Sequence, residues 1–247
     1  MFWLKDFGEI LRNCMRKTFG EISRGLFKFD KNPIFEIQAF LLLFLALDVV
    51  FGGLHILTKI DVLADRRFFL DFDGGFGERF QYFKAVMSGL FLTALAWRSK
   101  SVVFLWWASL NFYLFFDDLF RFHERIGGMM LGSYLDFPLI KGYHLGQVIF
   151  AFSIAGMGLG IMFFLWKRAD VYEQRISAGF LCILGFLGFS AVGVDFVESV
   201  LASGVWQDIA VLVEEIGEHL AMTLMVWWSA RAFFKRIRGI PPWLEVS

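Results

Sequence analysis

The stretch SVVFLWWASLNFYLFFDDLFRFHER, residues 101–125, joins a long apolar run to six ionisable side chains at its end. A membrane-spanning helix needs about 20 apolar residues, and the first part of this stretch comes close to that length. Further apolar runs of similar length lie on both sides of it. Across the chain, 57% of the 247 residues are hydrophobic, and the mean hydropathy is +0.60. We therefore predict an all-α fold, a polytopic membrane helical bundle.

The apolar runs define the predicted spans. Six transmembrane helices are expected at about 34–57, 83–98, 101–122, 146–166, 177–199 and 208–231. Before them, residues 2–27 repeat apolar side chains at three- and four-residue steps, with Lys and Arg on the other face. This pattern indicates an amphipathic helix in the membrane interface, and a helix packed on the chain's own cytoplasmic loops is the alternative. The predicted divisions are a cytoplasmic amphipathic helix at 1–32, a six-span domain at 33–238 and a cytoplasmic tail at 239–247.

The distribution of basic residues predicts the orientation. Cytoplasmic loops of membrane proteins carry an excess of Lys and Arg. With the N-terminus inside, two thirds of the 24 Lys and Arg residues fall on the inner side, so both termini are predicted to be cytoplasmic. This assignment counts Lys84 among the cations of an outer segment. The charged N-terminal segment has no uninterrupted apolar run, so it is not expected to be a cleavable signal peptide.

Composition and motifs exclude several classes of function. The formal net charge is zero, so nothing in the overall charge favours a nucleic-acid partner. Cys14 and Cys182 lie far apart and neither belongs to a CxxC pair, which leaves a zinc ribbon without support. The sequence has no GxSxG, HExxH or phosphate-binding loop motif that would name a nucleophile or a nucleotide.

Ionisable residues gather at the outer ends of three predicted spans. On a helix, Glu214 stacks on Glu218, and Glu215 stacks on His219. Such a face cannot point into lipid, because one charge at the bilayer centre costs at least about 2.5–3.5 kcal/mol. Carboxylates with imidazole suit a divalent cation, and we expect Mn, Fe or Zn. The predicted metal ligands are Asp117, Asp118, His123, Asp195, Glu198, Glu214, Glu215, Glu218 and His219.

Other polar residues have their own expected roles. Glu124 is the candidate catalytic base, and Arg121 is the candidate group that offsets the charge of neighbouring carboxylates. The alternative for the acids at 117–124 is an interfacial helix end with solvated charges. Asp48 lies near the middle of the first span. Two roles are open for it, a neutral acid hydrogen-bonded near Gln38 or a proton-relay group.

Two short motifs carry a resemblance. DDLFRFHE at 117–124, an acid in the next-to-last span and EEIGEHLAM at 214–222 resemble a group of bacterial multi-pass membrane proteins that pair an acid-then-HE element with a late EExxE element. The resemblance implies a bacterial inner membrane and no particular activity. His219 and the N-terminal helix lie outside its pattern. It implies one shared polar site of Asp117, Asp118, His123, Glu124, Asp195, Glu214, Glu215 and Glu218.

Three functions remain open from the sequence. The first is a metal-dependent enzyme of the inner membrane. Its metal site lies near the outer face, and it acts on a lipid or small apolar substrate. The second is a cation- or proton-coupled transporter, because intramembrane acids and histidines mark ion routes. The third is a non-catalytic membrane subunit that contacts partner proteins. The lipid bilayer is the partner common to all three.

Overall fold

The computed structural model describes residues 35–131, 142–194 and 204–237. In this part of the chain every regular element is helical, and no strand occurs. The α-helices are α2 (Phe35–Lys59), α3 (Phe76–Ser99), α4 (Val102–Phe120), α5 (Phe122–Leu131), α6 (Gly142–Trp166), α7 (Val171–Gly188) and α9 (Val205–Ile237). A 3₁₀ turn, η1 (Arg66–Phe68), precedes α3, and a π-helical segment, η2 (Phe189–Val194), continues α7. The predicted all-α membrane bundle is confirmed, whereas the predicted helix at 2–27 and the tail at 239–247 lie outside the described residues.

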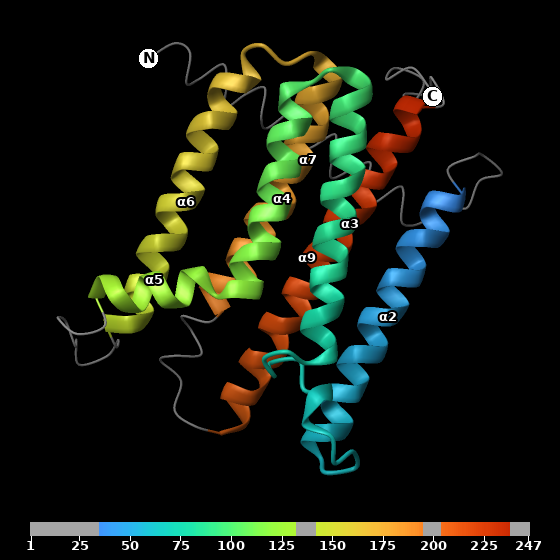
Figure 1. The fold of residues 1–247 in the computed structure, drawn as a ribbon. Helices are drawn as coiled ribbons and strands as arrows, with labels where there is room; N and C mark the ends of the chain where they lie inside the picture. Colours follow the sequence, from blue (N-terminus) through green and yellow to red (C-terminus); the bar gives the residue numbers. More distant parts are fainter. Residues whose placement is uncertain (1–34, 132–141, 195–203, 238–247) are drawn as a thin grey trace.

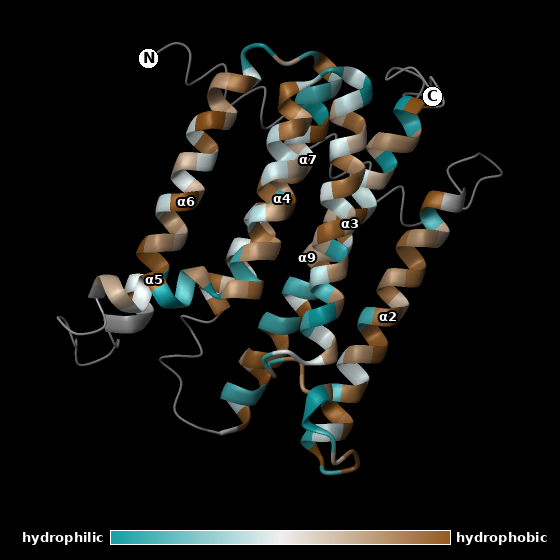
Figure 2. Ribbon diagram, viewed as in Figure 1, coloured by the Kyte–Doolittle hydropathy of each residue, from teal (hydrophilic) through white to brown (hydrophobic). Residues whose placement is uncertain are grey.

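In the described part of the chain, six long helices run alternately up and down along a common direction, and the short α5 lies across them (Figure 1). Among the described residues, four helices have the length and composition to cross a membrane: Ile37–Lys59, Val102–Phe120, Leu145–Trp166 and Val171–Val194. This number is smaller than the six spans expected. The long helices α3 and α9 are the two exceptions, because both carry hydrophilic residues within the bundle (Figure 2).

The apolar core lies where α3, α4, α7 and α9 meet. The Trp107 ring stacks on Phe180 with their centroids 4.9 Å apart, and its indole N–H donates to Ser177 Oγ at 2.9 Å. Trp228 of α9 donates to the carbonyl of Ile176 at 3.0 Å. A Cβ atom at Gly179 would lie 2.4 Å from the Trp228 ring, so the absence of a side chain permits this contact. These buried indoles therefore fix α7 against both α4 and α9.

Helix α6 packs mainly on α5 and is otherwise little covered by the bundle. The contact is close, because a Cβ atom at Gly146 would lie 2.0 Å from the carbonyl oxygen of Gly127 in α5. Gly156 and Gly160 form a GxxxG pattern farther along α6. A Cβ atom at either position would meet no heavy atom of the described residues within 4 Å. The close packing of α6 thus occurs at Gly146 and not at the GxxxG pattern.

Candidate metal centre

Three side chains around the junction of α4 and α5 form the candidate metal centre. Arg121 separates the two helices in the left-handed conformation, with φ of 51°. The turn brings ligand atoms of Asp117, Asp118 and His123 within 4.8 Å of one another. His123 Nδ1 lies 3.0 Å from Asp117 Oδ2, and the His123 backbone N–H donates to Asp117 Oδ1 at 3.1 Å. The chain therefore builds this group from residues within one short stretch.

The donor set and its spacing fit a divalent cation. Nitrogen and oxygen ligands lie about 2.0–2.2 Å from Zn²⁺, so two ligands of one ion are at most about 4.4 Å apart. The 4.8 Å limit on the Asp117, Asp118 and His123 atoms is close to that separation. Two carboxylates with one imidazole also match the preferences of Mn²⁺ and Fe²⁺.

Further polar groups surround the three residues. Tyr113 Oη donates to Asp117 Oδ1 at 3.4 Å. The Asp118 carboxylate interacts electrostatically with Glu218 of α9 and with Glu78 of α3, and Tyr82 donates a short hydrogen bond to Glu78. We call this side of the bundle the acidic end, defined by Glu78, Asp117, Asp118, Glu215 and Glu218.

The predicted catalytic residues lie beside this group. Arg121 Nη2 lies 2.6 Å from Asp73 Oδ2, and Arg121 Nη1 lies 3.9 Å from Glu124 Oε2. Both Arg121 and Glu124 keep about a third of their side-chain surface exposed, 37% and 35%. They therefore occupy an accessible rim next to His123, where they can meet a molecule arriving from outside the bundle.

The remaining predicted ligands divide into three sets. Glu215 interacts electrostatically with Glu214, Glu218 and Glu78, so the three acids of α9 face the same acidic end as Asp118. Asp195 and Glu198 lie outside the described residues. His219 is buried in a different group of side chains, and the contacts it makes with other described residues involve no member of the Asp117–Asp118–His123 group.

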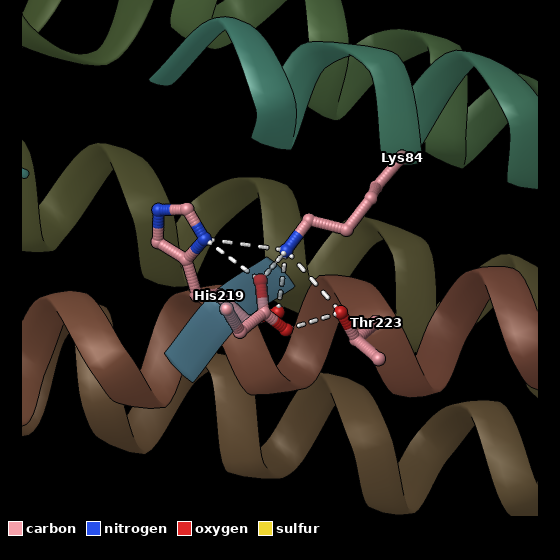
Figure 3. A network of polar contacts seen from close by, with 4 residues as sticks. Lys84, His219 and Thr223 are labelled. Atoms are coloured by element: carbon pink, nitrogen blue, oxygen red, sulfur yellow. Dashed lines mark hydrogen bonds and ion pairs between the residues drawn. The ribbon is translucent and has the colours of Figure 1, made fainter. Parts of the chain in front are cut away.

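His219 joins a buried network with Asp48 of α2, Lys84 of α3 and Thr223 (Figure 3). Lys84 is fully buried, and its ammonium donates to Asp48 Oδ1 at 2.8 Å, the His219 carbonyl at 2.8 Å and Thr223 Oγ1 at 3.3 Å. His219 Nδ1 lies 3.1 Å from Asp48 Oδ1, and Thr223 donates to Asp48 Oδ2 at 2.5 Å. Asp48 is therefore one half of an ion pair, and the expected neutral acid bonded near Gln38 is wrong.

Sequence reasoning missed Lys84. It was counted with the outer-segment cations, but the structure places it inside α3, also 4.6 Å from the Phe80 ring centroid. Asp48 is the sequence feature that could have indicated a buried role for Lys84, because an acid in the middle of an apolar run needs a partner. Lys84 is the cation that begins the next apolar run. Tyr113 and Glu78, which contact the metal centre and its surroundings, carried no comparable signal.

Comparison with known proteins gives one match. A family model described as a domain of unknown function, DUF8692, matches residues 78–232. The chain belongs to the DUF8692 family. Searches of curated proteins and of solved structures each found no match. The DUF8692 region includes Lys84, the Asp117–Asp118–His123 group and the acids of α9, whereas Asp48 lies outside it.

The candidate metal centre of this DUF8692 protein contains a histidine with a perturbed pKa. The hydrogen bond with Asp117 is the main cause, and it raises the pKa of His123 above its ordinary value, while burial acts in the opposite direction. A raised folded-state pKa means that the Asp117–His123 pair stabilises the metal-free protein fully below about pH 6.5, the ordinary histidine pKa. This contribution is lost as the pH rises through the folded-state pKa.

Cation binding at His123 is expected to strengthen with pH, because a proton must leave the imidazole before a metal can bind. Calorimetric titration with Mn²⁺ at about pH 6 and about pH 8, on either side of an ordinary histidine pKa, measures the effect. In Asp117→Asn, the pKa of His123 falls toward its ordinary value, so the remaining pH dependence moves to lower pH. An Mn²⁺ affinity that is constant over this range would contradict the expectation.

Proposed function

We propose that this protein is a metal-dependent membrane enzyme that binds Mn, Fe or Zn at Asp117, Asp118 and His123. The observation that supports the proposal is the convergence of these three ligand types at one helix junction. The substrate is a lipid or small apolar molecule, because the site lies beside the exposed apolar surface of the helical bundle, where a molecule held in the membrane can reach it.

Each residue has a role in this proposal. A bound divalent cation supplies Lewis acidity to an oxygen of the substrate. Asp117 holds the His123 ring through its Oδ2 atom, and Tyr113 orients the same carboxylate. Glu124 is the accessible carboxylate that accepts a proton from the reacting group. Arg121 holds Glu124 and Asp73 at the rim and stabilises negative charge that develops there.

The distribution of basic residues supports a location for the proposed enzyme. The excess of Lys and Arg that the sequence assigns to the inner side supports cytoplasmic termini and an acidic end that faces outward. The proposed membrane is the bacterial inner membrane, as the resemblance implies. The proposed reaction does not depend on the orientation of the chain or on the kind of membrane.

A cation- or proton-coupled transporter is the second candidate. The observation that favours it is the Asp48–Lys84–His219–Thr223 network, which extends ionisable groups from the acidic end into the bundle. An ion route needs polar groups on both sides of the membrane midplane. The network supplies such groups inside α2, α3 and α9, where an enzyme acting only at the acidic end has no need of them.

Metal content tests the proposal directly. Elemental mass spectrometry of the purified protein is expected to find about one Mn, Fe or Zn per chain. The double variant Asp117→Asn, Asp118→Asn and the single variant His123→Gln are expected to lose at least nine tenths of it, because ligands are removed. Asp208→Asn is the control, since its carboxylate forms an exposed ion pair with Lys59. No metal in the wild type, or equal metal in all variants, would reject the centre.

The two functions are then separated in vesicles. An enzyme is expected to convert a lipid of the vesicle in the presence of metal, and Glu124→Gln is expected to reduce that rate without removing metal. A transporter is expected to move cations or protons across the vesicle membrane, and the double variant Asp48→Leu, Lys84→Met, which removes both charges of the buried pair, is expected to stop the flux. A protein that binds metal and does neither would support the third function, a non-catalytic subunit.

A further inference from the structure

Helix α5 differs from every long helix in its direction. It lies crosswise to the long helices, between the end of α4 and the start of α6 (Figure 1). Arg121 redirects the chain at its start, and the backbone contact between Gly127 and Gly146 holds it against α6. Its direction is therefore fixed at both the α4 junction and the α6 contact, and α5 cannot be a span.

The two sides of α5 have different chemistry. Phe122, Ile126, Met129 and Met130 share one stripe of the helix, and all four are exposed, Met129 to 77%. Glu124 lies on the opposite side of the helix, and Gly127 is buried against α6. A helix that has an exposed apolar side and a polar side matches the pattern of helices in a membrane interface.

The apolar stripe continues onto a membrane-spanning helix. The last turns of α4 expose Phe116 and Phe120, which directly precede the α5 stripe in the chain. These residues belong to one of the helices long and apolar enough to cross a membrane. The Phe120 and Phe122 ring centroids are 5.5 Å apart, so a lipid leaflet around the end of α4 would also cover the α5 stripe.

We infer that α5 is an interfacial helix lying in the leaflet at the acidic end, and that the metal centre acts on the head group of a phospholipid. His123 lies on α5, so the helix sets the centre at the depth of lipid head groups, where phosphate oxygens can reach a divalent cation. The head-group part rests on the proposed metal function, whereas the position of α5 does not.

Spin-label accessibility tests the position of α5. Cys14 and Cys182 are replaced by serine, and a nitroxide is attached to Met129→Cys in phosphatidylcholine nanodiscs. Phe152→Cys on exposed α6 is the lipid-facing control, and Arg66→Cys in the exposed η1 turn is the water-facing control. The Met129 label is expected to favour collision with oxygen over a water-soluble nickel complex, as the Phe152 label does. A ratio equal to that of the Arg66 label would overturn the interfacial position.

Phosphorus relaxation tests the head-group part. Mn²⁺ bound to the full chain is expected to increase the ³¹P relaxation rate of the nanodisc phospholipid, and Asp118→Asn is expected to abolish the increase. Bound Mn²⁺ without any increase would overturn the head-group inference and leave the metal centre intact. If Mn²⁺ does not bind the wild type, the metal function itself fails, and the spin-label result still decides the position of α5.

Discussion

Asp48→Asn is expected to destabilise the protein by about 3–5 kcal/mol, because it leaves the Lys84 ammonium buried without a counter-charge. Lys84 has no exposed side-chain surface, and Asp48 keeps only 11%. The hydrogen bonds of Lys84 to Thr223 and to the His219 carbonyl remain, but neither acceptor carries a negative charge. Unfolding in mixed detergent micelles, followed by circular dichroism, measures the loss.

Two comparisons make this result specific. The double variant Asp48→Leu, Lys84→Met removes both charges and is expected to recover most of the lost stability, since apolar pairs replace buried ion pairs at little cost. Lys59→Met is the matched control, because Lys59 and Asp208 are only 2.7 Å apart but half exposed. Its expected loss is about 0–1 kcal/mol. Equal losses for Lys59→Met and Asp48→Asn would show that burial does not govern the pair.

Gly146→Ala is expected to reduce metal affinity by about 10–100-fold, the effect of displacing groups that orient ligands. The added methyl group would lie 2.0 Å from the Gly127 carbonyl oxygen, a backbone atom that cannot rotate away. Helix α5 must therefore move from α6, and it carries His123, one turn before Gly127. Overpacking also costs about 1–3 kcal/mol of folding stability. Mn²⁺ titration and detergent unfolding measure the two effects.

Gly156→Ala on the same helix is the control, and its expected effect has the opposite sign. A Cβ atom there meets nothing within 4 Å among the described residues, so no contact is strained. Alanine favours a helix over glycine by about 0.5–1 kcal/mol, which makes the variant slightly more stable. Metal affinity is expected to stay unchanged. A large loss of metal affinity in Gly156→Ala would indicate that α6 affects the metal centre through a contact other than the one at Gly146.

The sequence predicted the long helices well, because apolar runs bounded by charged residues are a strong signal. The predicted spans at 101–122 and 146–166 overlap α4 and α6 almost completely. The predicted span at 83–98 begins seven residues after α3 does, since the first turns of α3 are polar and therefore resemble a loop. The sequence did not predict α5 as a separate helix. A single non-glycine residue with a positive φ separates it from α4, and such a residue gives no turn signal in the sequence.

The candidate site was predictable where it is local in sequence. Asp117, Asp118 and His123 lie within seven residues, so residue type and closeness in the sequence pointed to them, whereas the turn at Arg121 that brings them together was not predicted. The placement of His219 was not predictable in that way. Its neighbours in the sequence suggested the metal centre, whereas its partners Asp48 and Lys84 come from helices that only the folded bundle brings together.

The Asp48–Lys84 pair has a consequence for how the chain enters the membrane during synthesis. These residues lie on α2 and α3, which leave the ribosome one after the other, whereas His219 follows Lys84 by 135 residues. A separate acid and a separate lysine would each cost about 2.5–3.5 kcal/mol on insertion at a helix centre. A hairpin that inserts with its two charges already paired avoids much of that cost. We therefore expect the apolar α2 to promote the membrane insertion of α3, a helix that is too polar to insert by itself.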